Sequence, residues 1–146
     1  MLNATFGGQE SATAAATGFT FTLAGVDRFN NDQWHHDRKS TQYRAATRRG
    51  GANALNIWLV DFSYLGIATF PWDYSRNPSI DGIRVQYTSL PGGSATNYDL
   101  GETATHEAGH WSRALPHVPG RLHDHQRRGE RHRGAEQCLE RLPRGP

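Results

Sequence analysis

At 146 residues the chain is long enough for one domain with a hydrophobic core and too short for two. Sixteen glycines and an apolar share of 36% favour a loop-rich globular protein over a helical bundle. No run of about 18 apolar residues occurs, so the sequence predicts no membrane-spanning helix, and a membrane is not an expected partner.

The charge is distributed unevenly along the chain. Eight basic residues stand against ten acidic ones through Trp111, and eight arginines stand against four acidic residues from Ser112 onward. The net charge of +2 therefore comes from the C-terminal segment, and nucleic acid is not an expected partner of the rest. The single cysteine, Cys138, excludes a disulfide within the chain and leaves the redox compartment undecided.

The sequence predicts four strands and one helix before its last motif. Residues 18–25 alternate large apolar side chains with threonine, the pattern of a half-buried strand. Residues 41–51 contain helix formers and end in a glycine pair. Residues 55–62 are apolar at nearly every position, which predicts a central strand buried on both faces. Residues 66–70 form a short strand closed by a proline, and residues 82–88 alternate again.

This order of elements predicts an α+β fold with a mixed twisted sheet. A turn-rich linker, residues 89–101, leads into the helical segment TATHEAGHW. After Trp111 the hydrophobic periodicity ends in an Arg/His-rich tail that has little to bury and is predicted to be disordered. The expected organisation is a partial catalytic domain over residues 1–111, followed by the tail, residues 112–146.

The segment HEAGH, residues 106–110, is an HExxH motif. Positions i and i+4 share one face of a helix, so His106 and His110 can bind the same zinc ion, Zn²⁺. Glu107 is then the general base and not a ligand, because its carboxylate can take a proton from a water that zinc makes more acidic. The alternative is a solvent-facing helix that carries these three residues for no chemical purpose.

The third ligand of a catalytic zinc site is missing from its usual position. In metzincins the motif extends to HExxHxxGxxH, where the glycine lets the chain turn and bring a third histidine to the metal. Here Arg113 occupies the glycine position and Pro116 the histidine position. His117 lies one residue later and is a weaker candidate, because the ring of Pro116 restricts the backbone before it.

Three stretches, LGIATFP, SLPGGS and LGETATHEAGHW, are more specific than HExxH alone. Through them, residues 1–111 resemble the pappalysin (cytophagalysin-type) family of metzincin zinc proteases, particularly its secreted fungal and bacterial members. The resemblance implies a metzincin-like N-terminal subdomain, incomplete because the third histidine and the methionine turn lie beyond the helix. It also implies a secreted zinc endopeptidase with protein or peptide substrates. As given, the chain shows no signal-peptide pattern, which favours either a cytoplasmic or a truncated protein.

The sequence after Trp111 departs from this family, whose members continue with a Leu-Gly-Leu-Tyr-His-Thr-Phe type segment. Codons for residues 112–120 can be chosen so that a shift of one nucleotide encodes this same run, which restores the glycine and the third histidine. The resulting hypothesis is that residues 112–146 are an out-of-frame translation of a protease gene, caused by a frameshift or by an error in the sequence or gene structure. The nucleotide sequence around the codons for Trp111 and Ser112 tests it.

Other interpretations stay open at this stage. The basic tail could bind nucleic acid or another polyanion, with strong salt dependence, and the chain could be a non-catalytic relic of the protease fold. For His35 and His36, within NNDQWHHDRK, a surface loop is the simpler explanation and a metal role the alternative. In the protease interpretation, an extended substrate adds alongside an edge strand near LGIATF.

Overall fold

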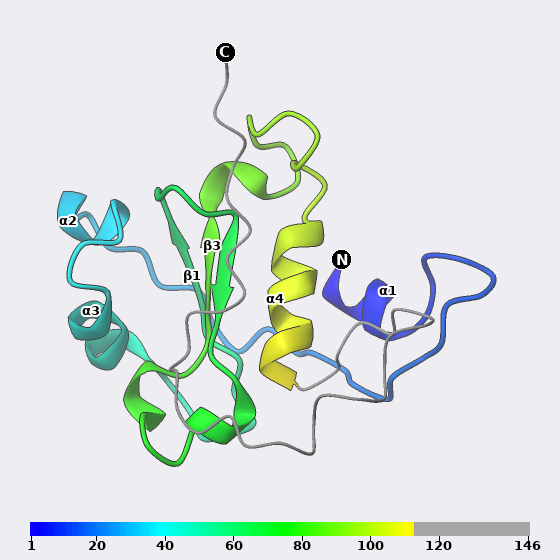
Figure 1. Ribbon diagram of the computed structural model, residues 1–146, viewed down its shortest axis with the longest axis horizontal. Coiled ribbons are helices and arrows are strands. Elements are labelled where there is room, and N and C mark those ends of the chain that lie inside the picture. Colours follow the sequence, from blue (N-terminus) through cyan, green and yellow to red (C-terminus); the bar gives the residue numbers. More distant parts are fainter. Residues whose placement is uncertain (113–146) are drawn as a thin grey trace, which may run out of the picture.

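A three-stranded sheet and a helix packed across it form the centre of the molecule (Figure 1). The computed structural model describes residues 1–112. The strands are β1 (Ile57–Val60), β2 (Gly66–Ala68) and β3 (Ile83–Gln86), and the packed helix is α4 (Glu102–Ser112). This combination of helices and a mixed sheet agrees with the expected α+β class.

Shorter helices surround the sheet. In chain order they are α1 (Leu2–Phe6), α2 (Asp32–His35) and α3 (Ser40–Thr47), followed by the 3₁₀ turns η1 (Pro71–Asp73), η2 (Pro78–Ile80) and η3 (Tyr87–Ser89). In Figure 1, α2 and α3 lie on the opposite side of the sheet from α4. Within the part of the chain that the structure describes, no helix is both long and apolar enough to cross a bilayer.

The sheet has the strand order β1-β3-β2, with β1 parallel and β2 antiparallel to β3. The prediction that residues 55–62 form the central strand is therefore wrong for the described sheet, because β1 lies at an edge and β3 lies in the middle. Ile57 and Leu59 are 39% and 48% exposed. The physical reason is that α4 packs on β2 and β3. Ile57 and Leu59 of β1, which are in register with the buried Ile83 and Val85, are therefore only partly covered.

The prediction of a strand over residues 18–25 is also wrong, since no ladder forms within this described segment. The side chain of Asn3 instead pairs with the backbone of Phe21: Oδ1 accepts its N–H at 2.7 Å and Nδ2 donates to its carbonyl at 2.9 Å. The Phe21 ring packs edge-on against Phe6, with centroids 5.1 Å apart, whereas Leu23 is 80% exposed. Residues 18–25 thus make an aromatic contact through Phe21 but do not pair with a neighbouring strand.

Other predicted elements form near their expected bounds. The helix expected over residues 41–51 ends at Thr47 because Arg48 is extended. The strand expected over residues 66–70 ends before Pro71, which begins a 3₁₀ turn. The helix that carries HEAGH is α4.

Strand alternation divides the residues of β3 between the two sides of the sheet. Ile83 and Val85 are fully buried and pack with Ala104 and Ala108 of α4 in the hydrophobic core. Arg84 points the other way and forms an ion pair with Asp37 at 2.5 Å. The residues around HEAGH therefore rest on the apolar face of the sheet.

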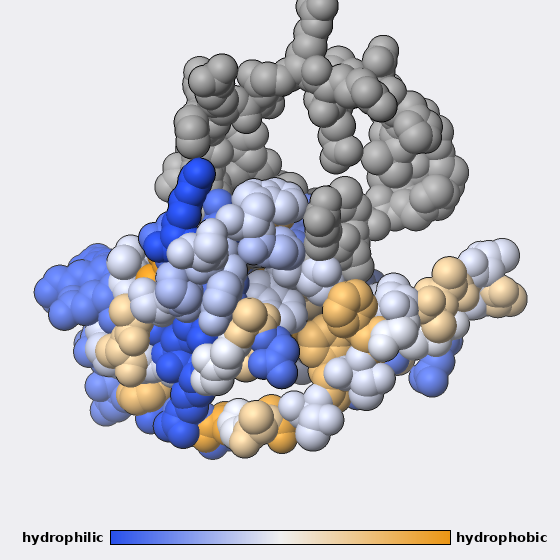
Figure 2. All heavy atoms as spheres, turned by 90° about the horizontal axis from the view of Figure 1, so that it is seen from below, coloured by the Kyte–Doolittle hydropathy of each residue, from blue (hydrophilic) through white to orange (hydrophobic). Residues whose placement is uncertain are grey.

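On the surface, hydrophobic residues occur in several separate groups among hydrophilic ones, as the face in Figure 2 shows. Residues 113–146 lie outside the described residues. The predictions of a disordered tail, of its out-of-frame origin and of His117 as a ligand all fall within that segment.

Candidate metal site on the helix

His106 and His110 project from the same side of α4, as their spacing predicts. Their Nε2 atoms lie 2.9 Å apart, and their ring centroids are 4.5 Å apart with the planes at 83°. His110 is buried and His106 half-buried. The two Nε2 atoms are within hydrogen-bonding distance of each other, and two imidazoles that face each other in this way can bind one metal ion.

The spacing of these two nitrogens, 2.9 Å, is slightly shorter than that of two ligands in a zinc site. At Zn–N bonds of about 2.05 Å, two ligands of a tetrahedral ion lie about 3.3 Å apart. The two Nε2 atoms would have to separate by only about 0.4 Å, which small rotations of the rings provide. The residues present therefore fit two positions of a zinc site, and the third protein ligand is not among residues 106–110.

Glu107 lies between the two histidines in sequence and is 1% exposed. Its carboxyl group packs against the backbone of Gly66, the first residue of β2. A Cβ added to Gly66 would lie 2.4 Å from Cγ and 2.6 Å from Oε1 of Glu107. Only glycine leaves room for this carboxylate, so the edge strand and the predicted base are in direct contact.

Aromatic rings flank the histidine pair at the end of β2. The ring of Phe70 meets His110 edge-on with centroids 5.5 Å apart, and it stacks on Trp72 at 4.6 Å with a 6° angle between planes. Trp72 is 57% exposed. Phe70 and Trp72 therefore form an aromatic wall beside His110.

A buried polar cluster anchors the C-terminal end of α4. Trp111 Nε1 donates to both carboxylate oxygens of Asp81, each at 3.1 Å. Arg48 Nη2 pairs with Asp81 at 3.1 Å, and Thr69 donates to the same carboxylate at 2.9 Å. Asp81 is 2% exposed, so in this low-dielectric position its charge is balanced by Arg48 and satisfied by hydrogen bonds.

Sequence reasoning did not identify Gly66 or Asp81 as part of the site. For Gly66 a signal existed, because a glycine inside a strand pattern often marks a close approach of another group. For Asp81 there was none: it precedes a strand in the chain, and its partners Trp111 and Arg48 lie 30 and 33 residues away.

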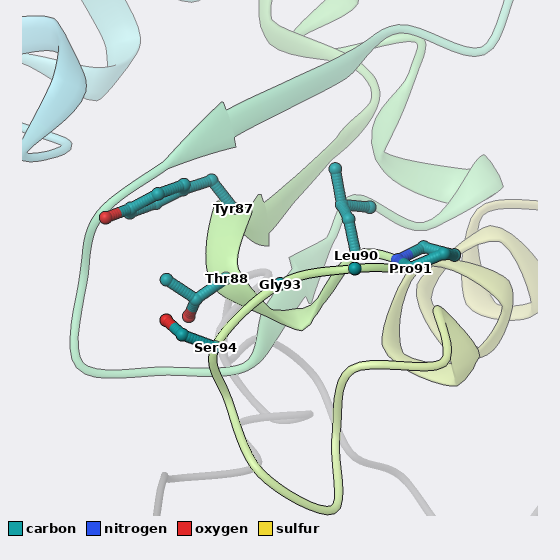
Figure 3. Close-up of a pocket in the computed structure, with 7 residues that line it drawn as sticks. Tyr87, Thr88, Leu90, Pro91, Gly93 and Ser94 are labelled. Atoms are coloured by element: carbon teal, nitrogen blue, oxygen red, sulfur yellow. The ribbon is translucent and has the colours of Figure 1, made fainter.

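The SLPGGS stretch lies elsewhere. A hollow of about 450 Å³ is lined by residues of the segment 87–94, from Tyr87 to Ser94 (Figure 3). His106, Glu107 and His110 do not line it. This motif therefore shapes a turn after β3 whose hollow is separate from the three residues of the HExxH motif.

Comparison with known proteins finds that the chain is similar to extracellular metalloproteases. An extracellular metalloprotease of Verticillium alfalfae is 45% identical over 96 residues, which cover 62% of this chain and 35% of the relative. One from Podospora anserina is 40% identical over 118 residues, covering 76% and 40%, and one from Arthroderma benhamiae is 37% identical over 109 residues, covering 71% and 37%. The chain is thus similar to part of an extracellular metalloprotease.

The extent of this similarity is limited. The chain spans about 35% to 40% of the length of these curated relatives. No protein-family model matches it. Among solved structures, mirolysin in complex with compound 9 is 42% identical, with a TM-score of 0.38 and coverage of 39% of this chain and 22% of that one. The relatives support the expected enzyme class, a metalloprotease.

Proposed function

We propose that this chain carries the metal-binding helix of a secreted, zinc-dependent endopeptidase of the pappalysin type. The observation that carries the proposal is the convergence of His106 and His110 on α4 beside a buried Glu107. Secretion and action on protein or peptide substrates are proposed from the relatives, which are named extracellular metalloproteases.

In this proposal His106 and His110 hold zinc, which when bound makes a water molecule acidic enough to attack a peptide carbonyl near neutral pH. Glu107 accepts the proton from that water and later delivers it to the leaving amine. Its packing against Gly66 restricts its rotamers, so the carboxylate is held in one orientation before a substrate arrives.

The edge position of β2 supports a site for the substrate backbone. One side of β2 pairs with β3, and its other side has no strand partner in the described sheet. An extended peptide can therefore add to this edge by backbone hydrogen bonds. Because Gly66 of β2 contacts Glu107, a peptide bound there lies close to the base.

The third zinc ligand is proposed to be encoded in the other reading frame after Trp111. The described residues supply two histidines on α4, and a catalytic zinc usually has three protein ligands. A protein restored to that frame should bind zinc at least about 10-fold more tightly than this chain, since even residues that only orient ligands contribute 10- to 100-fold.

A protease assay on the restored-frame protein tests the function. Glu107→Ala should lower kcat/KM on a protein substrate by a factor of about 10² to 10⁴, the usual contribution of a general base, while its zinc content stays unchanged. Glu102→Ala is the matched control, because Glu102 lies exposed in the first turn of the same helix, and it should retain activity. Retained activity in Glu107→Ala would remove Glu107 from its proposed role.

A further inference from the structure

A second group of metal-ligand side chains lies away from α4, at the opposite side of the sheet. It consists of His35 at the end of α2, His36 directly after it, and Asp61 directly after β1. One ligand atom from each of the three lies within 4.8 Å of the other two. Within residues 1–112, no other set of three such residues comes together in this way.

The closest pair in this group already has metal-site spacing. His36 Nδ1 lies 3.3 Å from Asp61 Oδ2, which matches the distance of about 3.3 Å between two ligands of a tetrahedral ion with bonds near 2.05 Å. In a tetrahedral site every pair of ligand atoms has this same spacing of about 3.3 Å. The His35 nitrogen therefore has to approach by up to about 1.5 Å, which the exposed His35 side chain can do by turning against Tyr87.

Neighbouring groups orient the Asp61 carboxylate and hold the two ligand-bearing segments together. Gln86 Nε2 donates to Asp61 Oδ1 at 3.1 Å, which leaves Oδ2 directed at His36. The backbone N–H of Asp61 donates to the carbonyl of His35 at 2.6 Å, so the two ligand-bearing segments are joined at the site. The His35 ring also packs on Tyr87, with centroids 5.2 Å apart. Fixed orientation of this kind is what outer residues contribute to natural metal sites.

We propose that His35, His36 and Asp61 bind a divalent transition-metal ion, with zinc as the reference case. Two imidazole nitrogens and one carboxylate suit zinc, nickel or copper, whereas calcium and magnesium require mainly oxygen ligands. The side chains of His36 and Asp61 are 50% and 40% exposed, so water can complete the coordination. The bound ion links the end of α2 to the end of β1 across about 25 residues of chain and stabilises the folded state.

Zinc titration of the full 146-residue chain by calorimetry tests the site. His36→Ala and Asp61→Asn should each remove one zinc equivalent or weaken its binding at least 10-fold. Asp32→Asn is the matched control, because it makes the same charge change on the exposed first turn of α2, and it should bind zinc as the unmodified chain does. Unchanged zinc number and affinity in His36→Ala and Asp61→Asn would overturn the proposal and leave an ordinary His–Asp ion pair.

A second measurement separates this site from α4. In a His106→Ala variant, which cannot form the helix site, added Co²⁺ should broaden the amide signals of residues 35, 36 and 61. A large excess of calcium should not reverse this broadening. Broadening confined to other residues, or lost on addition of calcium, would overturn the assignment. Failure of the protease proposal would leave these results unaffected, because neither measurement depends on peptide hydrolysis.

Discussion

Glu107 and Gly66 show how a single residue without a side chain can position a candidate catalytic group. The carboxylate is buried on the helix and meets the backbone of the edge strand at Gly66. A glycine in a short strand normally weakens it, because it adds chain entropy and packs no side chain. Here the missing Cβ is the space that the carboxylate occupies, which gives the glycine a role that pairing in the sheet alone does not explain.

Gly66→Ala should therefore displace Glu107. Because the added Cβ would lie 2.4 Å from Cγ, the acid has to leave its present rotamer or the strand has to move. In the restored-frame protein we expect kcat to fall about 10-fold or more, with a smaller change in zinc affinity. Gly25→Ala is the control, since a Cβ there meets nothing within 4 Å. A Gly66→Ala protein with full kcat would show that the contact does not position the base.

At the scale of elements, α4 is attached to the sheet by two kinds of contact. Ala104 and Ala108 pack on the buried residues of β3, and small side chains at this spacing let the helix approach the sheet closely. At its C-terminal end, Trp111 is bound to the carboxylate of Asp81, just before β3. The apolar contact sets the distance between helix and sheet, whereas the hydrogen bonds fix how the histidine-bearing end is directed.

Trp111→Phe tests this second attachment. The ring volume is largely kept while the N–H that donates to Asp81 is removed, and a hydrogen bond to a charged group contributes about 1.5–3 kcal/mol. We expect the free energy of unfolding in urea to fall by roughly this amount. Trp72→Phe makes the same change at a residue that is 57% exposed, and it should alter stability by no more than about 0.5 kcal/mol. Equal effects in both variants would count against an anchoring role for Asp81.

At the scale of the whole molecule, order in the described chain is concentrated around β3. This strand is paired on both sides, and its inward residues Ile83 and Val85 are fully buried. The segment from residue 18 to residue 29 has no ladder, and Leu23 and Val26 within it are 80% and 60% exposed. More interactions must therefore break to open the backbone of β3 than to open the backbone of residues 18–29.

Hydrogen exchange followed by mass spectrometry should reveal this difference. Backbone amides of β3 and of the middle of α4 should exchange slowest, because opening them breaks core packing as well as hydrogen bonds. Peptides covering residues 18–29 should exchange fastest within the first 112 residues. Similar protection in both regions would mean that this segment is paired in solution, as the alternating pattern of residues 18–25 predicts.

The sequence by itself determined the local features of this protein. The i, i+4 spacing of His106 and His110 places both on one side of a helix whatever that helix packs against, and the structure has this arrangement. Helix α3 and the strands near Gly66 and Ile83 likewise follow from periodicity and turn residues. The roles of His106 and His110 in metal binding and of Glu107 in catalysis remain predictions.

Only the tertiary structure decided which separated segments meet. The apolar run 55–62 became an edge strand because β2 pairs with the other side of β3 and β1 has no further partner in the described sheet, a choice that periodicity does not encode. The contacts of Glu107 with Gly66 and of Trp111 with Asp81 each join residues 30 or more positions apart, and Asp61 meets His36 across 25. Residues so far apart in sequence come together only through the packing of the sheet. A local pattern can mark Gly66 as a point of close approach, but it cannot name the residue that approaches.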